Sequence, residues 1–85
     1  MDPYKIVKYP LSTEKSIRLM ESQNELVFVV DVDANKSMIK KAIEEMFKVS
    51  VKKVKTHLRK GEKRAYVKFS EKNPAIDIAT QLGLM

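Results

Sequence analysis

The segment from Val49 to Phe69 alternates apolar and polar residues on both sides of a short polar break, and this pattern predicts a β-hairpin. Successive side chains of a strand point to opposite faces, so a period of two separates the two sets. Both arms therefore have an apolar face and a polar face. The apolar set is Val54, Thr56, Leu58, Ala65, Val67 and Phe69, and the polar set is Lys53, Lys55, His57, Arg59, Arg64, Tyr66 and Lys68.

Two further strands are predicted upstream. The run Leu26–Val30 is continuously apolar, which indicates a central strand covered on both faces. A short strand over Tyr4–Tyr9 would end at Pro10. Within the hairpin, Lys52 and Lys53 interrupt the alternation, so we expect either a β-bulge or a late start of the strand there.

Three helices are predicted from their caps and apolar stripes. The first is capped by Ser12 or Thr13, reaches about Glu21 and has a narrow stripe. Asn35 caps the second, which carries the broadest stripe: Ile39, Ala42, Ile43, Met46 and Phe47. Asn73 is expected to cap the third, with Pro74 at its first position and Gly83 after its end.

This order of elements predicts one α+β domain over residues 1–85, with a mostly antiparallel sheet of three to four strands. The chain has no cysteine, and its single histidine, His57, lies on a basic strand, so we expect no metal site, no cofactor and no enzymatic activity. No apolar run approaches the ~20 residues of a membrane span, and no signal peptide is evident. We therefore expect a cytoplasmic protein without membrane insertion, monomeric when free.

Positive charge is concentrated on the hairpin. Residues 48–68 contain nine Lys or Arg and one acid, Glu62, whereas the whole chain carries only +6. A polyanion explains this imbalance better than a solvated face that blocks edge pairing. The predicted RNA-binding residues are Lys53, Lys55, His57, Arg59, Lys60, Lys63, Arg64, Tyr66 and Lys68. A peripheral membrane protein and a free RNA-binding regulatory module are the alternative interpretations, and the latter would use the same hairpin.

Four segments together carry a resemblance to a known family. They are Pro10–Ser16 (PLSTEKS), Leu26–Asp31 (LVFVVD), Ile39–Phe47 (IKKAIEEMF) and Lys60–Val67 (KGEKRAYV). In this order they resemble the large-subunit ribosomal protein L23 family, over nearly the whole chain. The compact length resembles the archaeal type.

The resemblance implies a structural constituent of the large ribosomal subunit that binds large-subunit rRNA beside the exit of the polypeptide tunnel. It implies ribosomal protein L29 as a neighbour, and signal recognition particle and other exit-site factors as partners. The segment matching the family's factor-docking site includes Ser12, Thr13 and Glu14, and Arg18 follows on the same helix. Because this helix carries charges of mixed sign, we expect it to lie away from the hairpin, as a second functional surface. The hairpin tip is shorter than in bacterial members, which argues against a tunnel-lining role.

Overall fold

A computed structural model describes residues 3–83. The elements in chain order are α1 (Pro3–Ile6), β1 (Val7–Pro10), α2 (Glu14–Gln23), β2 (Glu25–Val30), α3 (Lys36–Phe47), β3 (Val51–Arg59), β4 (Glu62–Phe69) and α4 (Ala75–Gln81). None of the helices within this range is long and apolar enough to cross a bilayer.

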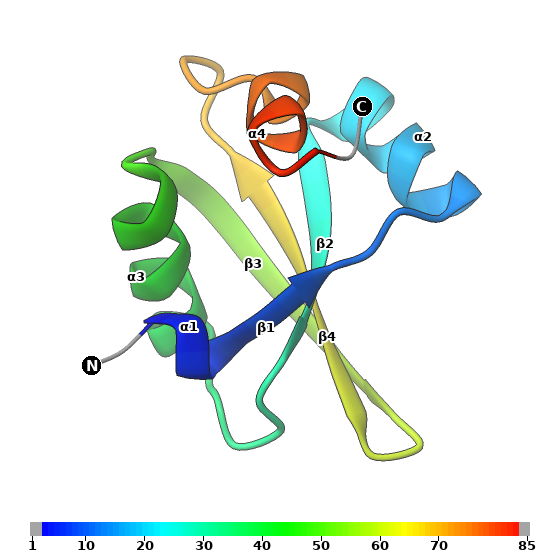
Figure 1. The fold of residues 1–85 in the computed structure, drawn as a ribbon, viewed down its shortest axis with the longest axis vertical. Helices are drawn as coiled ribbons and strands as arrows, with labels where there is room; N and C mark the ends of the chain where they lie inside the picture. Colours follow the sequence, from blue (N-terminus) through cyan, green and yellow to red (C-terminus); the bar gives the residue numbers. More distant parts are fainter. Residues whose placement is uncertain (1–2, 84–85) are drawn as a thin grey trace.

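The four strands form one sheet in the order β1-β2-β4-β3, and every neighbouring pair is antiparallel. Figure 1 views this sheet from its β1 edge, with β3 farthest away. Strands β2 and β3 are parallel to each other, with β4 between them, so α3 forms the crossover that joins them. The structure thus confirms the predicted α+β class and the antiparallel sheet.

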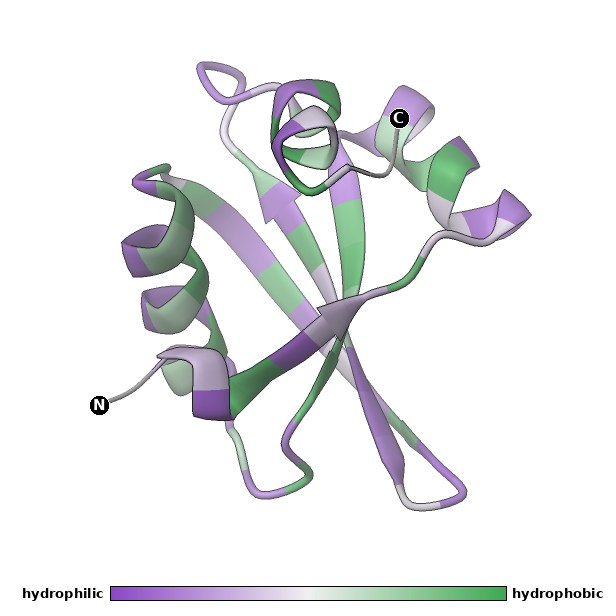
Figure 2. Cartoon of the chain, in the orientation of Figure 1, coloured by the Kyte–Doolittle hydropathy of each residue, from purple (hydrophilic) through white to green (hydrophobic). Residues whose placement is uncertain are grey.

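The main core lies between the sheet and helices α1, α3 and α4. Its sheet side consists of Leu26, Phe28, Val30, Val51, Val54, Ala65, Val67 and Phe69, and α3 and α4 contribute Ile39, Ala42, Ile43, Ala75, Ile78 and Ala79. The ring of Phe28 lies 6.2 Å from that of Phe47 at the end of α3. Alternating apolar and polar bands along β3 are visible in Figure 2, where the apolar bands mark the core face.

Strand β2 is buried along its whole length, as the continuous apolar run predicted. Leu26, Phe28 and Val30 belong to the main core, whereas Val27 and Val29, each 4% exposed, lie on the opposite face. The sheet therefore has an apolar strip on the face without α3 and α4.

The first predicted strand is only half correct. Residues Pro3–Ile6 form one helical turn, and β1 begins at Val7. The register of β1 shifts between Val7 and Tyr9, so this short edge strand contains a bulge. The bulge predicted at Lys52 is confirmed by the register shift between Val51 and Lys53.

Two positions of the predicted apolar set lie outside the main core: Thr56 is half-buried, and Leu58 is 63% exposed. Leu58 pairs with Lys63 close to the turn, where β3 and β4 extend beyond the main core. Alternation alone assigned Leu58 to a buried face, but a buried position also needs a covering element.

The prediction that Asn73 caps the last helix is wrong. Asn73 Oδ1 instead accepts hydrogen bonds from Ser50 N and Ser70 Oγ. The first amide of α4, Ala75 N, donates to Asn24 Oδ1 at 2.6 Å. The cap is thus supplied by a residue 51 positions earlier.

Asn24 connects three parts of the fold. It ends α2 in the left-handed conformation, with φ 57°. Its Nδ2 donates to the carbonyl oxygens of Phe69, Ser70 and Asn73, at 3.2, 3.2 and 3.3 Å. The Nδ2 and Oδ1 atoms of the Asn24 side chain therefore hold the end of β4 and the start of α4 against the junction between α2 and β2.

We expect Asn24→Ala to lower the free energy of unfolding by about 3 kcal/mol or more. Lost hydrogen bonds account for about 0.5–1.5 kcal/mol each, and a left-handed alanine adds about 1 kcal/mol. Asn24→Gly loses the same bonds without the backbone strain and should lose less. Urea unfolding followed by circular dichroism measures both variants, and a loss below about 1 kcal/mol in Asn24→Ala would contradict the role assigned to this residue.

Candidate nucleic-acid interface

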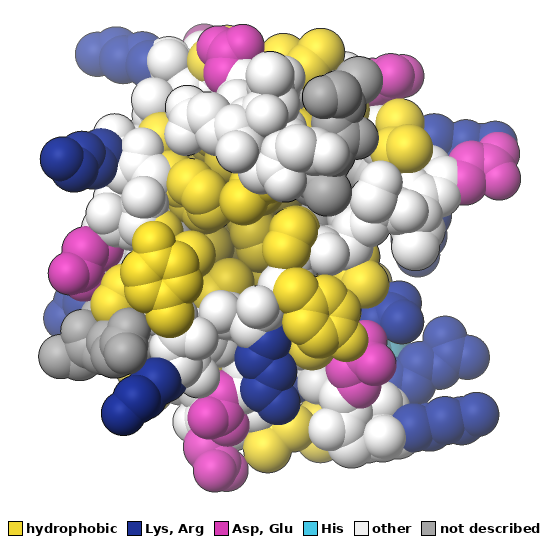
Figure 3. Space-filling model, viewed as in Figure 1, with side chains coloured by type: hydrophobic (Ala, Val, Ile, Leu, Met, Phe, Trp, Pro, Cys, Tyr) yellow, Lys and Arg dark blue, Asp and Glu magenta, His cyan; other side chains and the backbone are white. Residues whose placement is uncertain are grey.

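The strand register gathers most of the predicted RNA-binding side chains on one face of the sheet. Three cross-strand pairs define it, namely Lys53 with Lys68, Lys55 with Tyr66 and His57 with Arg64. The alternate residues Val54, Ala65 and Val67 point into the main core, so this face is the one away from α3 and α4. We call it the basic face: Lys53, Lys55, His57, Arg59, Arg64, Tyr66 and Lys68. In Figure 3 Lys and Arg side chains project at the lower right, over the end of the β3–β4 hairpin.

The two strands contribute side chains of different exposure. Lys53, Lys55, His57 and Arg59 on the edge strand β3 are exposed, whereas Arg64, Tyr66 and Lys68 on β4 are half-buried. Long exposed side chains can follow a phosphate backbone, and half-buried ones are better oriented for specific contacts.

Arg64 is held in place by Glu62. Its Nε donates to Glu62 Oε1 at 3.0 Å, and both side chains are partly exposed. This hydrogen bond raises the pKa of Arg64, desolvation acts in the opposite direction, and Tyr66 raises it further. Arg64 is therefore a permanent cation, while Glu62 offsets part of the positive charge next to the turn.

The hairpin tip is a two-residue turn. Lys60 and Gly61 connect the paired residues Arg59 and Glu62, with φ 49° and 78°. Two successive left-handed residues suit the right-handed twist of a hairpin. The turn leaves Lys60 exposed at the end of the basic hairpin.

Lys63 does not lie on the basic face, although the sequence analysis grouped it with the RNA-binding residues. It pairs with Leu58 and Val30, which places it on the same face as Ala65 and Val67. Its Nζ donates to the carbonyl oxygen of Ala34, before α3. The ammonium group thus helps to fix the β2–α3 loop.

Two residues missed by the sequence analysis border the basic face. The bulge in β1 pairs Tyr9 with Val29, whose side chain lies on that face, and Tyr9 is 50% exposed. Simple alternation would have placed Tyr9 with Val7 in the main core, so the sequence pattern pointed the other way. The second residue, Lys15, belongs to α2.

Lys15 lies at a shallow depression beside Arg64 and Tyr66. The depression has a volume of about 20 Å³ and is lined by Leu11, Thr13, Lys15, Ser16, Leu19, Val27, Arg64 and Tyr66. Helix α2 therefore borders the basic face on its Lys15 side, whereas the sequence analysis expected it to lie away from the hairpin.

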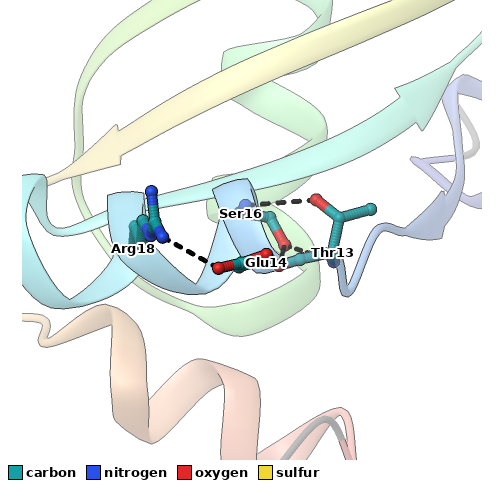
Figure 4. Close-up of polar contacts among 4 residues, drawn as sticks. All are labelled: Thr13, Glu14, Ser16 and Arg18. Carbon is teal, nitrogen blue, oxygen red and sulfur yellow. Dashed lines mark hydrogen bonds and ion pairs between the residues drawn. The ribbon is translucent and has the colours of Figure 1, made fainter.

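The remaining predicted site residues, Ser12, Thr13, Glu14 and Arg18, lie at or near the start of α2, and Figure 4 shows the last three. Thr13 is the N-cap: its Oγ1 accepts from Ser16 N, and Ser16 Oγ accepts from Thr13 N at 2.7 Å, which completes a capping box. Ser12 is exposed and does not cap the helix. Glu14 and Arg18, both largely exposed, form an ion pair at 2.8 Å, so one solvent-facing side of α2 presents a mixed-sign pair.

The described part of the chain holds no set of three acidic or histidine side chains close enough to share a metal ion. What residues 3–83 do present is a sheet with a helical core on one side and cationic side chains with a tyrosine on the other.

Comparison with protein families agrees with this arrangement. Residues 5–80 match the family model described as ribosomal protein L23. Because this match covers most of the 85 residues, it establishes the family, which implies a structural role in the ribosome. The chain belongs to the ribosomal protein L23 family of the large ribosomal subunit.

Proposed function

We propose that the basic face binds large-subunit rRNA beside the exit of the polypeptide tunnel. The observation that carries this proposal is the register of β3 and β4, which aligns cations of both strands on one face. The main core lies on the other face, so the side chains of the basic face lie outside it and are exposed or half-buried.

Electrostatics is the main source of affinity in this proposal. Lysine and arginine that neutralise phosphates release condensed counterions, which gives sequence-independent binding. Two acidic groups offset part of this charge, since Glu62 bonds to Arg64 and Glu25 stands opposite Lys68. Lys53, Lys55 and Arg59 on β3 have no acidic partner among the described ion pairs, so the face stays positive.

The outward side of α2 is the proposed docking surface for signal recognition particle and other exit-site factors. Glu14 and Arg18 are exposed there and fixed by their mutual ion pair, while Thr13 and Ser16 stabilise the start of the helix. Exposed charges of this kind mainly affect association rate and specificity. Ribosomal protein L29 is the proposed protein neighbour, and an archaeal-type subunit is the proposed setting.

Association with the subunit is tested by sedimentation after a high-salt wash. We expect the protein to remain with large ribosomal subunits, because structural proteins are held by many contacts. Complete release into the free fraction at moderate salt would favour the alternative, a free RNA-binding regulatory module.

The electrostatic mechanism predicts a steep salt dependence. With about five phosphate contacts, log affinity for an rRNA fragment should fall with log salt at a slope on the order of −4. The double substitution Lys55→Gln, Arg59→Gln should reduce this slope by about 1.5, since each contact contributes roughly 0.7–0.9. Fluorescence anisotropy at several salt concentrations measures both.

The matched control is Lys40→Gln, Lys41→Gln, which removes the same charge from the exposed side of α3. It should leave the slope within experimental error. An equal reduction in both double variants would show that net charge, and not the basic face, determines the affinity.

Glu14→Gln should weaken binding of signal recognition particle to reconstituted subunits by roughly 2- to 5-fold, because a rim charge typically contributes about 1 kcal/mol or less. Incorporation of the protein into subunits should be normal, since Glu14 is exposed and bonded only to Arg18 in the described contacts. Glu21→Gln on the same helix is the control. Unchanged factor binding together with failed incorporation would place Glu14 in an rRNA or protein contact within the subunit.

A further inference from the structure

Two tyrosines flank the apolar strip on the RNA-facing side of the sheet. Tyr9 pairs with Val29, and Tyr66 pairs with Val27. We infer that Tyr9 and Tyr66 form a stacking platform for unpaired nucleotides, with Lys15 and Arg64 contacting the phosphates between them. This inference rests on the proposed function and specifies the class of RNA that the basic face accepts.

The sheet geometry sets the spacing of the two rings. Tyr9 and Tyr66 lie on strands separated by β2, and their partners in β2 are two residues apart. Strands about 4.8 Å apart and a rise of about 3.4 Å per residue place the two Cα atoms about 12 Å apart. Because side chains stand roughly perpendicular to a sheet, the two rings do not lie on each other, and each is available to a different base.

Because of this spacing, a regular duplex cannot stack bases on both tyrosine rings. Stacked bases follow one another at about 3.4 Å, and both faces of an internal base are covered by its neighbours. Two bases that lie on tyrosines about 12 Å apart must be unstacked and splayed. Single-stranded loops and bulges offer such bases, and stacking on aromatic side chains is their usual recognition mode.

The two valines between the rings are covered. Val27 and Val29 are each 4% exposed, so they support the platform from below, and the partly exposed Leu11 and Leu19 line a depression with Val27 and Tyr66. A volume of about 20 Å³ accommodates one water molecule, so a base cannot insert there. A base must lie flat over Tyr66, which favours stacking and disfavours readout of the base edge.

Charges border the platform on two sides. Lys15 projects from α2 at the depression, and Arg64 stands opposite Val29 on β4, held by Glu62. Lys55 is next to Tyr66 on β3. An RNA strand whose bases lie on the two rings therefore keeps its phosphates within reach of these cations. Two tyrosines that only face solvent would have no need of cations beside them.

The platform is tested with two RNA probes: a ten-nucleotide oligouridine strand, and a blunt duplex of the same length. Tyr9→Leu and Tyr66→Leu should each weaken binding of the single strand by between about 5-fold and 150-fold, the range for loss of one base–aromatic stack. Binding of the duplex should change less than twofold. Tyr4→Leu, a substitution of a tyrosine 71% exposed on α1, is the control and should change neither affinity.

Tyrosine emission supplies a measurement that does not depend on disruptive variants. The chain contains three tyrosines and no tryptophan, so stacked bases should quench the emission of the wild-type protein directly. Single-stranded RNA should quench it more strongly than the duplex. The double variant Tyr9→Phe, Tyr66→Phe retains two stacking rings, so it should keep the single-strand affinity within about threefold while losing the quenching.

The possible failures are distinguishable. If wild-type protein binds neither RNA, the proposed function fails and the platform with it. If both RNAs bind with the expected salt dependence but the leucine variants match the wild type, the basic face binds phosphates alone and the platform is wrong. Equal losses for single strand and duplex would also overturn it, because they would show that the tyrosines only support the sheet.

Discussion

Burial of β2 on both faces is the constraint on which the rest of the structure depends. An apolar strand of this kind must have a neighbour on each edge and a cover on each side. Strands β1 and β4 supply the edges, and α3 and α4 complete the main core on one side. On the other side Leu11 and Leu19 approach Val27, and Tyr9 and Arg64 lie next to Val29. The apolar strip that results is buried beneath the side chains of the proposed RNA surface.

The distribution of helices separates stability from binding. Within residues 3–83, the main core lies on the side of the sheet that faces α1, α3 and α4, and α2 adds Met20 to it. Charge can therefore accumulate on the opposite face of β3 and β4 without the desolvation cost of a buried cation. Lys63 illustrates the boundary, because on the core side a lysine needs a specific acceptor, and it finds one in the carbonyl of Ala34.

Small irregularities at strand and helix ends determine the details of the surface. The bulge in β1 turns Tyr9 toward the basic face, and the left-handed Asn24 positions β4 and α4 relative to α2. Helix α2 in turn brings Lys15 to Tyr66. The candidate interface is thus wider than the hairpin, although the hairpin carries most of its charge.

The sequence by itself determined the features that depend on local periodicity and composition. These are the class of the fold, the hairpin with its two faces, the central strand, the cap at Asn35 and the concentration of cations. Side chains two or four residues apart meet the same environment, so a pattern in the chain predicts them directly. Most of the basic face could be predicted in this way, from Lys53, Lys55, Arg64 and Tyr66.

Tertiary structure alone decided the features that depend on residues distant in the chain. Leu58 is exposed because no helix reaches the end of the hairpin, and Asn24 rather than Asn73 caps α4 because the fold brings residues 24 and 75 together. Tyr9 joins the basic face through a one-residue bulge, which reverses the face of every later position in a strand. None of these contacts leaves a periodic signal in the sequence, because each is formed between elements that only folding makes neighbours.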